Sequence, residues 1–468
     1  MAPATHLNSS ALAEVVRLRP FRRLWLVFGL SSLGDWLGLL ATSSFASAQM
    51  GSPAAQGAAF GAVIAVQLLP SLLLGPVAGV LADRFDRRHT MVSVDVARFL
   101  LFASIPTAAL LSHDHAIVVG WAAAASFTAQ AAAMVWNPAK EAAVPNLIPR
   151  HRLETANQLT IITTYGITPV LAALAFAGAA RLPSLGGTDA AAFALYFDAL
   201  TFLASAAVVH FGVPEISGRG APASARTESA GAALRTGWRY LTGTPMLRGL
   251  VIGLLGAFAG AGIVVGGARF YSRSLGGGDA TFGLLFAALF VGFGAGVLAG
   301  PKLSAQVPRR LVFGLSVQLA GLAVVLLSVT VHLAAALAEV VVVGFGAGLA
   351  FLCGVTIIGG DVDDAVRGRV FAFVQTAARA MLLLAVASAS ALAGAGSPHR
   401  LILGPYSVRL ADSRLLYAVA GLCGVTVGLV ALRQMAGADI VSLYRAGRRE
   451  LERRRVQHRA GSADRRTR

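Results

Sequence analysis

The residues that could do chemistry in this sequence are a few charged side chains inside long apolar stretches. Asp35 lies halfway along the stretch 24–48, and Asp95 and Arg98 lie three residues apart within 90–111. A charged side chain at the centre of a lipid bilayer costs roughly 2.5–3.5 kcal/mol on insertion scales, so each one requires a physical reason. These charged positions are therefore the first candidates for a functional site.

Asp35 is the leading candidate among them. Burial in hydrocarbon favours the neutral form of a carboxyl group, which makes Asp35 a candidate proton carrier. The alternative is a carboxylate that is permanently paired with an arginine or hydrogen-bonded to a neighbouring helix. The residue and its position leave both interpretations open.

Two further charged residues could line an internal cavity. Arg379 lies about nine residues into the apolar stretch 370–394, where it could bind an anionic group, offset a carboxylate or form a structural ion pair. Glu339 lies near one end of the stretch 333–358, where it could face a vestibule or simply reach water. We treat both as cavity candidates.

The remaining charged residues inside apolar stretches are interpreted as structural. Asp95 and Arg98 share one helix face, so they are expected to neutralise each other. Asp198 lies in the stretch 189–212, and a structural role is expected for it as well. No nucleophile and base, and no metal-ligand cluster, occurs at usable spacing, so the sequence predicts neither an enzyme nor a metal or cofactor site.

The elements that would position these residues are long apolar helices. Of the 468 residues, 56% are hydrophobic and 13% charged, against roughly 25% charged in soluble proteins. Apolar blocks of roughly 20 residues are long enough to cross a bilayer as helices. We predict twelve spans, near 24–48, 59–82, 90–111, 115–137, 156–180, 189–212, 249–271, 280–300, 309–331, 333–358, 370–394 and 414–433.

A polar segment divides the twelve spans into six and six, which predicts an all-α integral membrane protein of two six-helix bundles. The predicted parts are a cytoplasmic N-terminus 1–23, a first bundle 24–212, a cytoplasmic linker 213–248, a second bundle 249–433 and a basic cytoplasmic tail 434–468.

The distribution of basic residues along the chain indicates how the protein is oriented in the membrane. The net charge is +17, but the basic residues gather in alternate short loops and in the tails, which places both termini in the cytoplasm. Nucleic-acid binding is therefore not expected, whereas contact with anionic lipids is. Five arginines on the other side are exceptions: Arg181, Arg273, Arg400, Arg409 and Arg414.

The turn after the second span has a specific order of residues. From Gly79 to Arg88 it reads Gly-Val-Leu-Ala-Asp-Arg-Phe-Asp-Arg-Arg. Glycine near a helix end permits close approach of a neighbour, Asp83 can cap a helix N-terminus, and the arginines can pair with carboxylates or lipid phosphates. This run resembles the signature of the major facilitator superfamily, and a reduced copy stands at Gly296 to Arg310. The residues of this predicted cytoplasmic gate motif are Gly79, Asp83, Arg84, Arg87 and Arg88.

Further runs resemble a drug and siderophore exporter branch of that superfamily, and the transporter half of actinobacterial fusions to thymidylate kinase. No Gly-x-x-x-x-Gly-Lys loop follows, so no kinase is expected. The runs that carry the likeness are Ser32–Trp36, Pro138–Ala142, Val144–Asn146, Ala156–Asn157, Phe197–Phe202 and Arg367–Phe371.

The resemblance implies a multi-pass transporter of the bacterial cytoplasmic membrane with a substrate cavity between the bundles, working by alternating access. The most specific function that the resemblance implies is that of a multidrug-type antiporter, which exports an amphiphilic small molecule in exchange for protons. The segment Ser126–Val135 lacks the arginine that many proton-coupled exporters carry, which leaves open a lipid-like or metabolite carrier without proton coupling. A non-transporting membrane interaction protein is the third alternative, and the sequence does not indicate an oligomeric state.

Overall fold

The computed structural model describes most of the membrane-spanning chain. The described residues are 14–74, 86–149, 152–181, 190–216, 235, 238–240, 243, 245–395, 399–403, 406–410 and 413–435. Most of the predicted linker and nearly all of the predicted tail therefore lie outside them, and the domain boundaries stay predictions.

Twelve helical spans in the described residues are long and apolar enough to cross a membrane, which confirms the predicted fold class. The first half holds α2 (Arg19–Ala48), α3 (Pro53–Leu73), α5 (Arg87–Leu111), α6 (His115–Leu147), a span made of α7 (Leu153–Ile162), η2 (Thr163–Ile167) and α8 (Thr168–Ala179), α9 (Ala190–Gly212) and the short η3 (Pro214–Ile216). The second half holds α11 (Pro245–Ser274), α12 (Asp279–Gln306), α13 (Arg309–Val329), α14 (Leu333–Asp361), α15 (Asp364–Ala395) and the helix Ser413–Met435.

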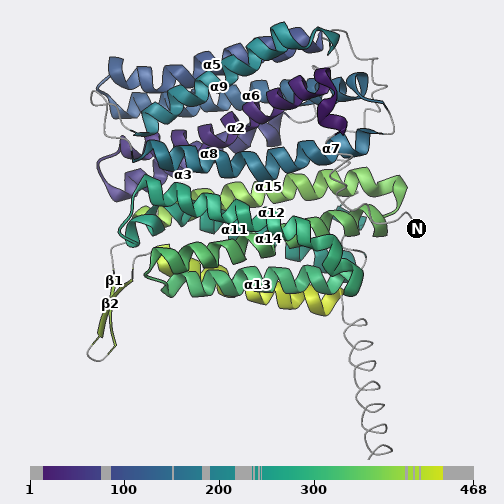
Figure 1. The fold of residues 1–468 in the computed structure, drawn as a ribbon. Helices are drawn as coiled ribbons and strands as arrows, with labels where there is room; N and C mark the ends of the chain where they lie inside the picture. The colour runs from purple at the N-terminus through teal and green to yellow at the C-terminus, as the bar shows by residue number, and fades with distance from the viewer. Residues whose placement is uncertain are drawn as a thin grey trace, which may run out of the picture.

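One element was not predicted from the sequence. The antiparallel strands β1 (His399–Leu403) and β2 (Tyr406–Leu410) form a hairpin after α15, with His399 opposite Leu410. Figure 1 shows the hairpin extending beyond the helices at one end of the molecule. We call this end the hairpin end, and the opposite end, where Arg19, Arg87 and Arg309 begin α2, α5 and α13, the arginine-rich end.

Local capping fixes where several helices begin. The Ser52 hydroxyl accepts a hydrogen bond from the Ala55 amide at 3.2 Å, and Pro53 occupies the first helical position of α3. The Asp86 carboxylate accepts from the His89 amide at 3.0 Å at the start of α5, and Asp114 caps α6. These caps satisfy amides that have no partner within the helix, so the helices begin at defined residues.

The two halves contact each other through α3 with α15 and through α8 with α12. In Figure 1 the first half lies above the second, and these four helices form the middle layers. A Cβ on Gly57 would lie 2.2 Å from the Ser390 carbonyl oxygen, and a Cβ on Gly394 would lie 2.4 Å from that of Pro53. Only glycine permits this close helix approach, which occurs at the hairpin end.

The hydrophobic core also differs between the two ends. The largest buried cluster joins the halves near the hairpin end, where the Phe60 and Phe282 ring centroids are 5.8 Å apart. At the arginine-rich end, the cluster around Phe21 and Trp136 contains residues of the first half alone, and the cluster around Phe313 contains residues of the second half alone. The halves are therefore packed together at the hairpin end and have separate cores at the other.

Candidate functional site

The charged residues of the first half meet where α2, α5 and α9 pack together. Arg98 on α5 is fully buried, and its guanidinium forms an ion pair with the Asp35 carboxylate on α2. Its Nη1 donates to the Ser31 hydroxyl at 3.3 Å, and its Cζ lies 3.9 Å from the centre of the Phe202 ring. Arg98 thus joins three helices through one side chain.

Asp95 and Arg98, which were expected to neutralise each other, form no direct ion pair within the described residues. The Asp95 Oδ2 accepts a hydrogen bond from the Ser205 hydroxyl of α9 at 2.6 Å, and Arg98 pairs with Asp35 instead. The two residues share one helix face, but the short Asp95 side chain is directed to α9 whereas the longer arginine reaches across to α2. A spacing of three residues permits a pair without requiring one.

Asp35 and Asp198 have contrasting surroundings. The Asp35 side chain is 40% exposed although its partner Arg98 is completely buried. Asp198 is completely buried, and a Cβ on Gly38 of α2 would lie 2.8 Å from its Oδ2. The structure therefore places one partly exposed and one fully buried carboxyl group beside the same arginine, while the functional role of each stays a prediction.

A second polar contact of α2, made with the span containing Pro169, was not predicted from the sequence. Because Pro169 has no amide hydrogen, the helix passes through the π-helical turn η2 and leaves the Thr164 carbonyl without a main-chain donor. The Trp36 Nε1 donates to this oxygen at 3.0 Å, and the Trp36 ring lies 4.7 Å from that of Phe290 in the second half. The sequence signal was the run Gly166–Pro169.

The two cavity candidates of the second half lie apart from this cluster. Arg379 is an exposed residue of α15, and no ion pair or hydrogen bond of its side chain is found within the described parts of the chain. It precedes Ser390 by eleven residues, or about three helical turns, so it lies on the face of α15 that contacts the first half. Glu339 accepts a hydrogen bond from the Thr330 hydroxyl at 2.8 Å.

Only part of the predicted gate motif is described. Gly79, Asp83 and Arg84 lie outside the described residues, Arg87 begins α5, and the Arg88 Nη2 donates to the His210 carbonyl at the end of α9. Arg88 therefore holds two helices of the first half together in this conformation.

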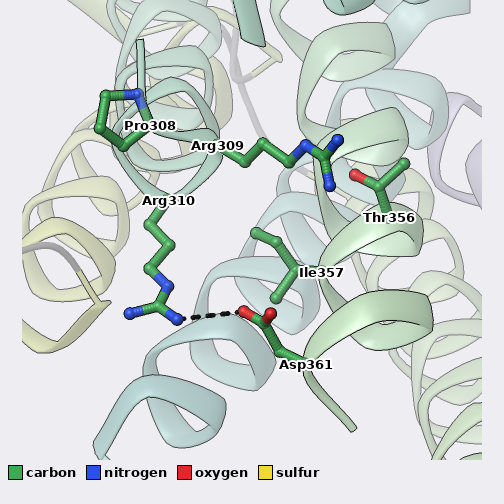
Figure 2. Close-up of a pocket in the computed structure, with 6 residues that line it drawn as sticks. All are labelled: Pro308, Arg309, Arg310, Thr356, Ile357 and Asp361. Atoms are coloured by element: carbon green, nitrogen blue, oxygen red, sulfur yellow. Dashed lines mark hydrogen bonds and ion pairs between the residues drawn. The ribbon is translucent and has the colours of Figure 1, made fainter. Parts of the chain in front are cut away.

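The copy of the motif in the second half forms a surface cavity of about 350 Å³ at the arginine-rich end. The Arg310 Nη2 lies 3.1 Å from the Asp361 carboxylate at the end of α14, and Figure 2 shows the Arg309 side chain extending toward Thr356. A Cβ on Gly296 would lie 2.2 Å from the Phe345 carbonyl oxygen, so this glycine permits the close packing of α12 and α14. The copy contains no aspartate of its own, and the carboxylate beside Arg310 comes from α14.

Solved structures with the same fold are membrane transporters. A D-xylose–proton symporter has a TM-score of 0.65 at 14% identity, covering 88% of this chain and 97% of the other. A D323A mutant of the nucleoside transporter NupG has a TM-score of 0.64 at 12% identity, covering 89% and 100%. Such low identities show the fold alone. The twelve spans and these neighbours define the fold class of the chain as that of multi-pass transporters with two six-helix halves.

The sequence comparisons give the family. Residues 9–462 match the family described as transmembrane secretion effector, and the chain belongs to that family of the major facilitator superfamily. An MFS-type transporter of Mycobacterium tuberculosis is 31% identical over 402 residues, covering 81% of this chain and 86% of the relative. The MFS-type transporter YfiS of Bacillus subtilis is 29% identical over 189 residues, or 39% of each chain. The predicted membrane transporter is confirmed, and the drug and siderophore branch stays a prediction.

Proposed function

We propose that this transporter exports an amphiphilic small molecule in exchange for protons. The observation that carries the proposal is the Asp35–Arg98 pair at mid-span, in which the acid is 40% exposed and its partner fully buried. An exposed acid can exchange protons with water, while loss of its charge leaves a buried guanidinium without its counter-ion. Protonation of Asp35 is thereby linked to the packing of α2 against α5. The direction of transport rests on the resemblance to drug and siderophore exporters.

The packing of the halves supports alternating access. They share one core at the hairpin end and have separate cores at the arginine-rich end. We propose that the arginine-rich end faces the bacterial cytoplasm, with both termini, so that this conformation is inward-facing. Among the solved structures of the same fold, a bacterial homologue of ferroportin is described as inward-facing. The gate motif around Asp83 would then close the arginine-rich end when the hairpin end opens.

Three further charged residues are assigned to contacts with the substrate, the outer entrance and lipid. Arg379 lies on the face of α15 that opposes the first half, beyond the glycine contacts, so we place it beside the transport path. An exposed guanidinium at this depth is far less costly next to water than next to lipid. Glu339, hydrogen-bonded to Thr330, is placed near the outer entrance. Anionic lipids are expected to contact the arginines of the arginine-rich end, among them Arg309.

The test is proton release driven by a transported probe. Purified protein is reconstituted in proteoliposomes, and a panel of amphiphilic dyes, with ethidium and rhodamine 6G as the first probes, is added with a pH indicator on the other side. Proton movement that follows dye transport in the wild type and falls at least tenfold in Asp35→Asn is expected. Asp114→Asn is the matched control, because Asp114 is an exposed helix cap and asparagine caps equally well.

Three other outcomes contradict the proposal. Dye flux without proton movement indicates a carrier that is not proton-coupled. The absence of an arginine from Ser126–Val135 favours this alternative. An unchanged proton signal in Asp35→Asn removes the role given to that residue. Neither flux nor proton movement for any dye of the panel overturns multidrug-type export and leaves the non-transporting interaction protein as the alternative.

Membrane orientation has its own test. Gly51 lies at the hairpin end and Gly368 at the arginine-rich end, both are exposed, and a Cβ at either position meets no atom within 4 Å. Each is replaced by cysteine in a chain without Cys353 and Cys423. A membrane-impermeant maleimide applied to intact cells is expected to label Gly51→Cys and to leave Gly368→Cys unlabelled. The reverse pattern inverts the proposed topology.

A further inference from the structure

Asp198 is a membrane-embedded acid that takes no part in the Asp35–Arg98 ion pair. It lies on α9, is completely buried, and neither carboxylate oxygen has a hydrogen-bond partner among the described residues. The neighbouring Thr201 hydroxyl donates to the Asp198 backbone carbonyl at 2.7 Å and not to the carboxyl group. An ionised carboxylate buried without a partner is so unfavourable that the group binds a proton instead.

The charges around Asp198 do not balance without protons. The elements packed against α9 are α2, α5, α8 and the short η3, whose Glu215 is exposed and lies beyond the end of α9, seventeen residues after Asp198. Asp35 comes from α2, Asp95 and Arg98 come from α5, and the sequence of α8 contains no titratable side chain. One guanidinium therefore faces three carboxyl groups, of which Asp35 is the one paired with it. Neutrality requires protons on the other two acids, Asp95 and Asp198.

Contacts on α9 and on α2 both place Arg98 close to Asp198. Its Cζ is 3.9 Å from the centre of the Phe202 ring, and Phe202 follows Asp198 by four residues on the same face of α9. On α2, Gly38 follows the Arg98 partner Asp35 by about one turn, and a Cβ there would lie 2.8 Å from the Asp198 Oδ2. A long arginine side chain can cover such a distance by changing its rotamer.

We propose that Asp198 is a second proton-binding site of the transporter, and that Arg98 exchanges between Asp35 and Asp198. In the conformation described here Asp198 holds the proton and Arg98 pairs with Asp35. When the proton passes from the Asp198 carboxyl to the Asp35 carboxylate, Arg98 pairs with Asp198, and the net charge of the cluster is unchanged. Asp35, with its exposed side chain, then delivers the proton to water.

This inference rests on proton coupling, but its first test does not require transport. Infrared spectra of the purified protein in lipid at neutral pH are expected to show the carbonyl stretch of a buried protonated carboxyl group. Asp198→Asn removes part of that band, whereas Asp114→Asn, which changes an exposed helix cap, leaves it intact. A band that is unchanged by Asp198→Asn overturns the proposal.

Whether Asp198→Asn folds also tests the proposal. Asparagine has the size and neutrality of a protonated aspartic acid, so Asp198→Asn is expected to fold, with a melting temperature close to that of the wild type. If the Asp198 carboxylate were an obligatory partner of Arg98, the neutral side chain would leave a buried guanidinium uncompensated and the protein would be strongly destabilised. A variant that fails to fold therefore also overturns the proposal.

The transport assay separates this inference from the proposed function. Protons moved per dye molecule are expected to fall at least tenfold in Asp198→Asn. A wild-type proton signal in this variant overturns the exchange of Arg98 while proton-coupled export stands. No proton signal in the wild type overturns the proposed function and the coupling part of this inference together, whereas the infrared band still decides whether Asp198 holds a proton.

Discussion

The contact between Gly57 and Ser390 gives a quantitative prediction about conformational change. In Gly57→Ala the added Cβ would lie 2.2 Å from the Ser390 carbonyl oxygen and 3.1 Å from the Gly394 Cα. These are backbone atoms, so α3 and α15 must move apart for the methyl group to fit. Overpacking of this kind typically costs 1–3 kcal/mol. Because the contact closes the hairpin end, that cost falls on the conformation described here.

A cost of about 1–3 kcal/mol corresponds to a shift of roughly 5- to 150-fold toward conformations in which the hairpin end is open. Spin labels at Gly51 in the first half and Gly278 in the second measure this opening, because a Cβ at either position meets no atom within 4 Å. Electron–electron distances in Gly57→Ala are expected to gain a longer component. A distribution identical to that of unsubstituted Gly57 would refute the close contact as the barrier to opening.

Substitutions at three more positions test other contacts. Arg273→Ala removes the 2.6 Å hydrogen bond to Gln56 that joins the halves, and since such a bond contributes about 1 kcal/mol, opening should increase about fivefold in the same distance measurement. Trp36→Phe keeps an aromatic ring but removes the indole donor to the Thr164 carbonyl, which also accepts from the Thr168 and Ser32 hydroxyls, so thermal unfolding should show a loss of at most about 1 kcal/mol, and no change would argue against the bond. Arg379→Gln should slow the export of anionic dyes at least fivefold relative to the export of neutral dyes, whereas Arg379→Lys should remain active. Equal export rates for the two kinds of dye in Arg379→Gln would show that Arg379 does not lie beside the transport path.

The fold was accessible from the sequence because hydrocarbon imposes a simple length and composition on each span. Twelve apolar blocks, the charged turns between them and the reduced copy at Gly296 to Arg310 were sufficient to predict two bundles of six helices. The strands β1 and β2 could not be predicted in this way, because they lie in a connection outside the spans, where no such constraint applies.

The charged cluster was only partly predictable. The positions of Asp35, Arg98 and Asp198 in the sequence identify them as costly, yet which acid pairs with the arginine depends on how α2, α5 and α9 are rotated against one another. Arg273 shows the same limit. It was an exception to the charge rule for loops, and its contact with Gln56 explains its place at the hairpin end.

The π-helical turn η2 has a consequence for the surface that α8 presents. A π turn holds one residue more than an α-helical path of the same course, and one residue corresponds to about 100° of rotation around the axis. If the same residues Thr163–Ile167 were wound as a regular α-helix, every later side chain of α8 would turn by that angle. Ala173 and Ala177 would then leave Gly283, against which they now lie, and bulkier neighbours would meet the second half in their place.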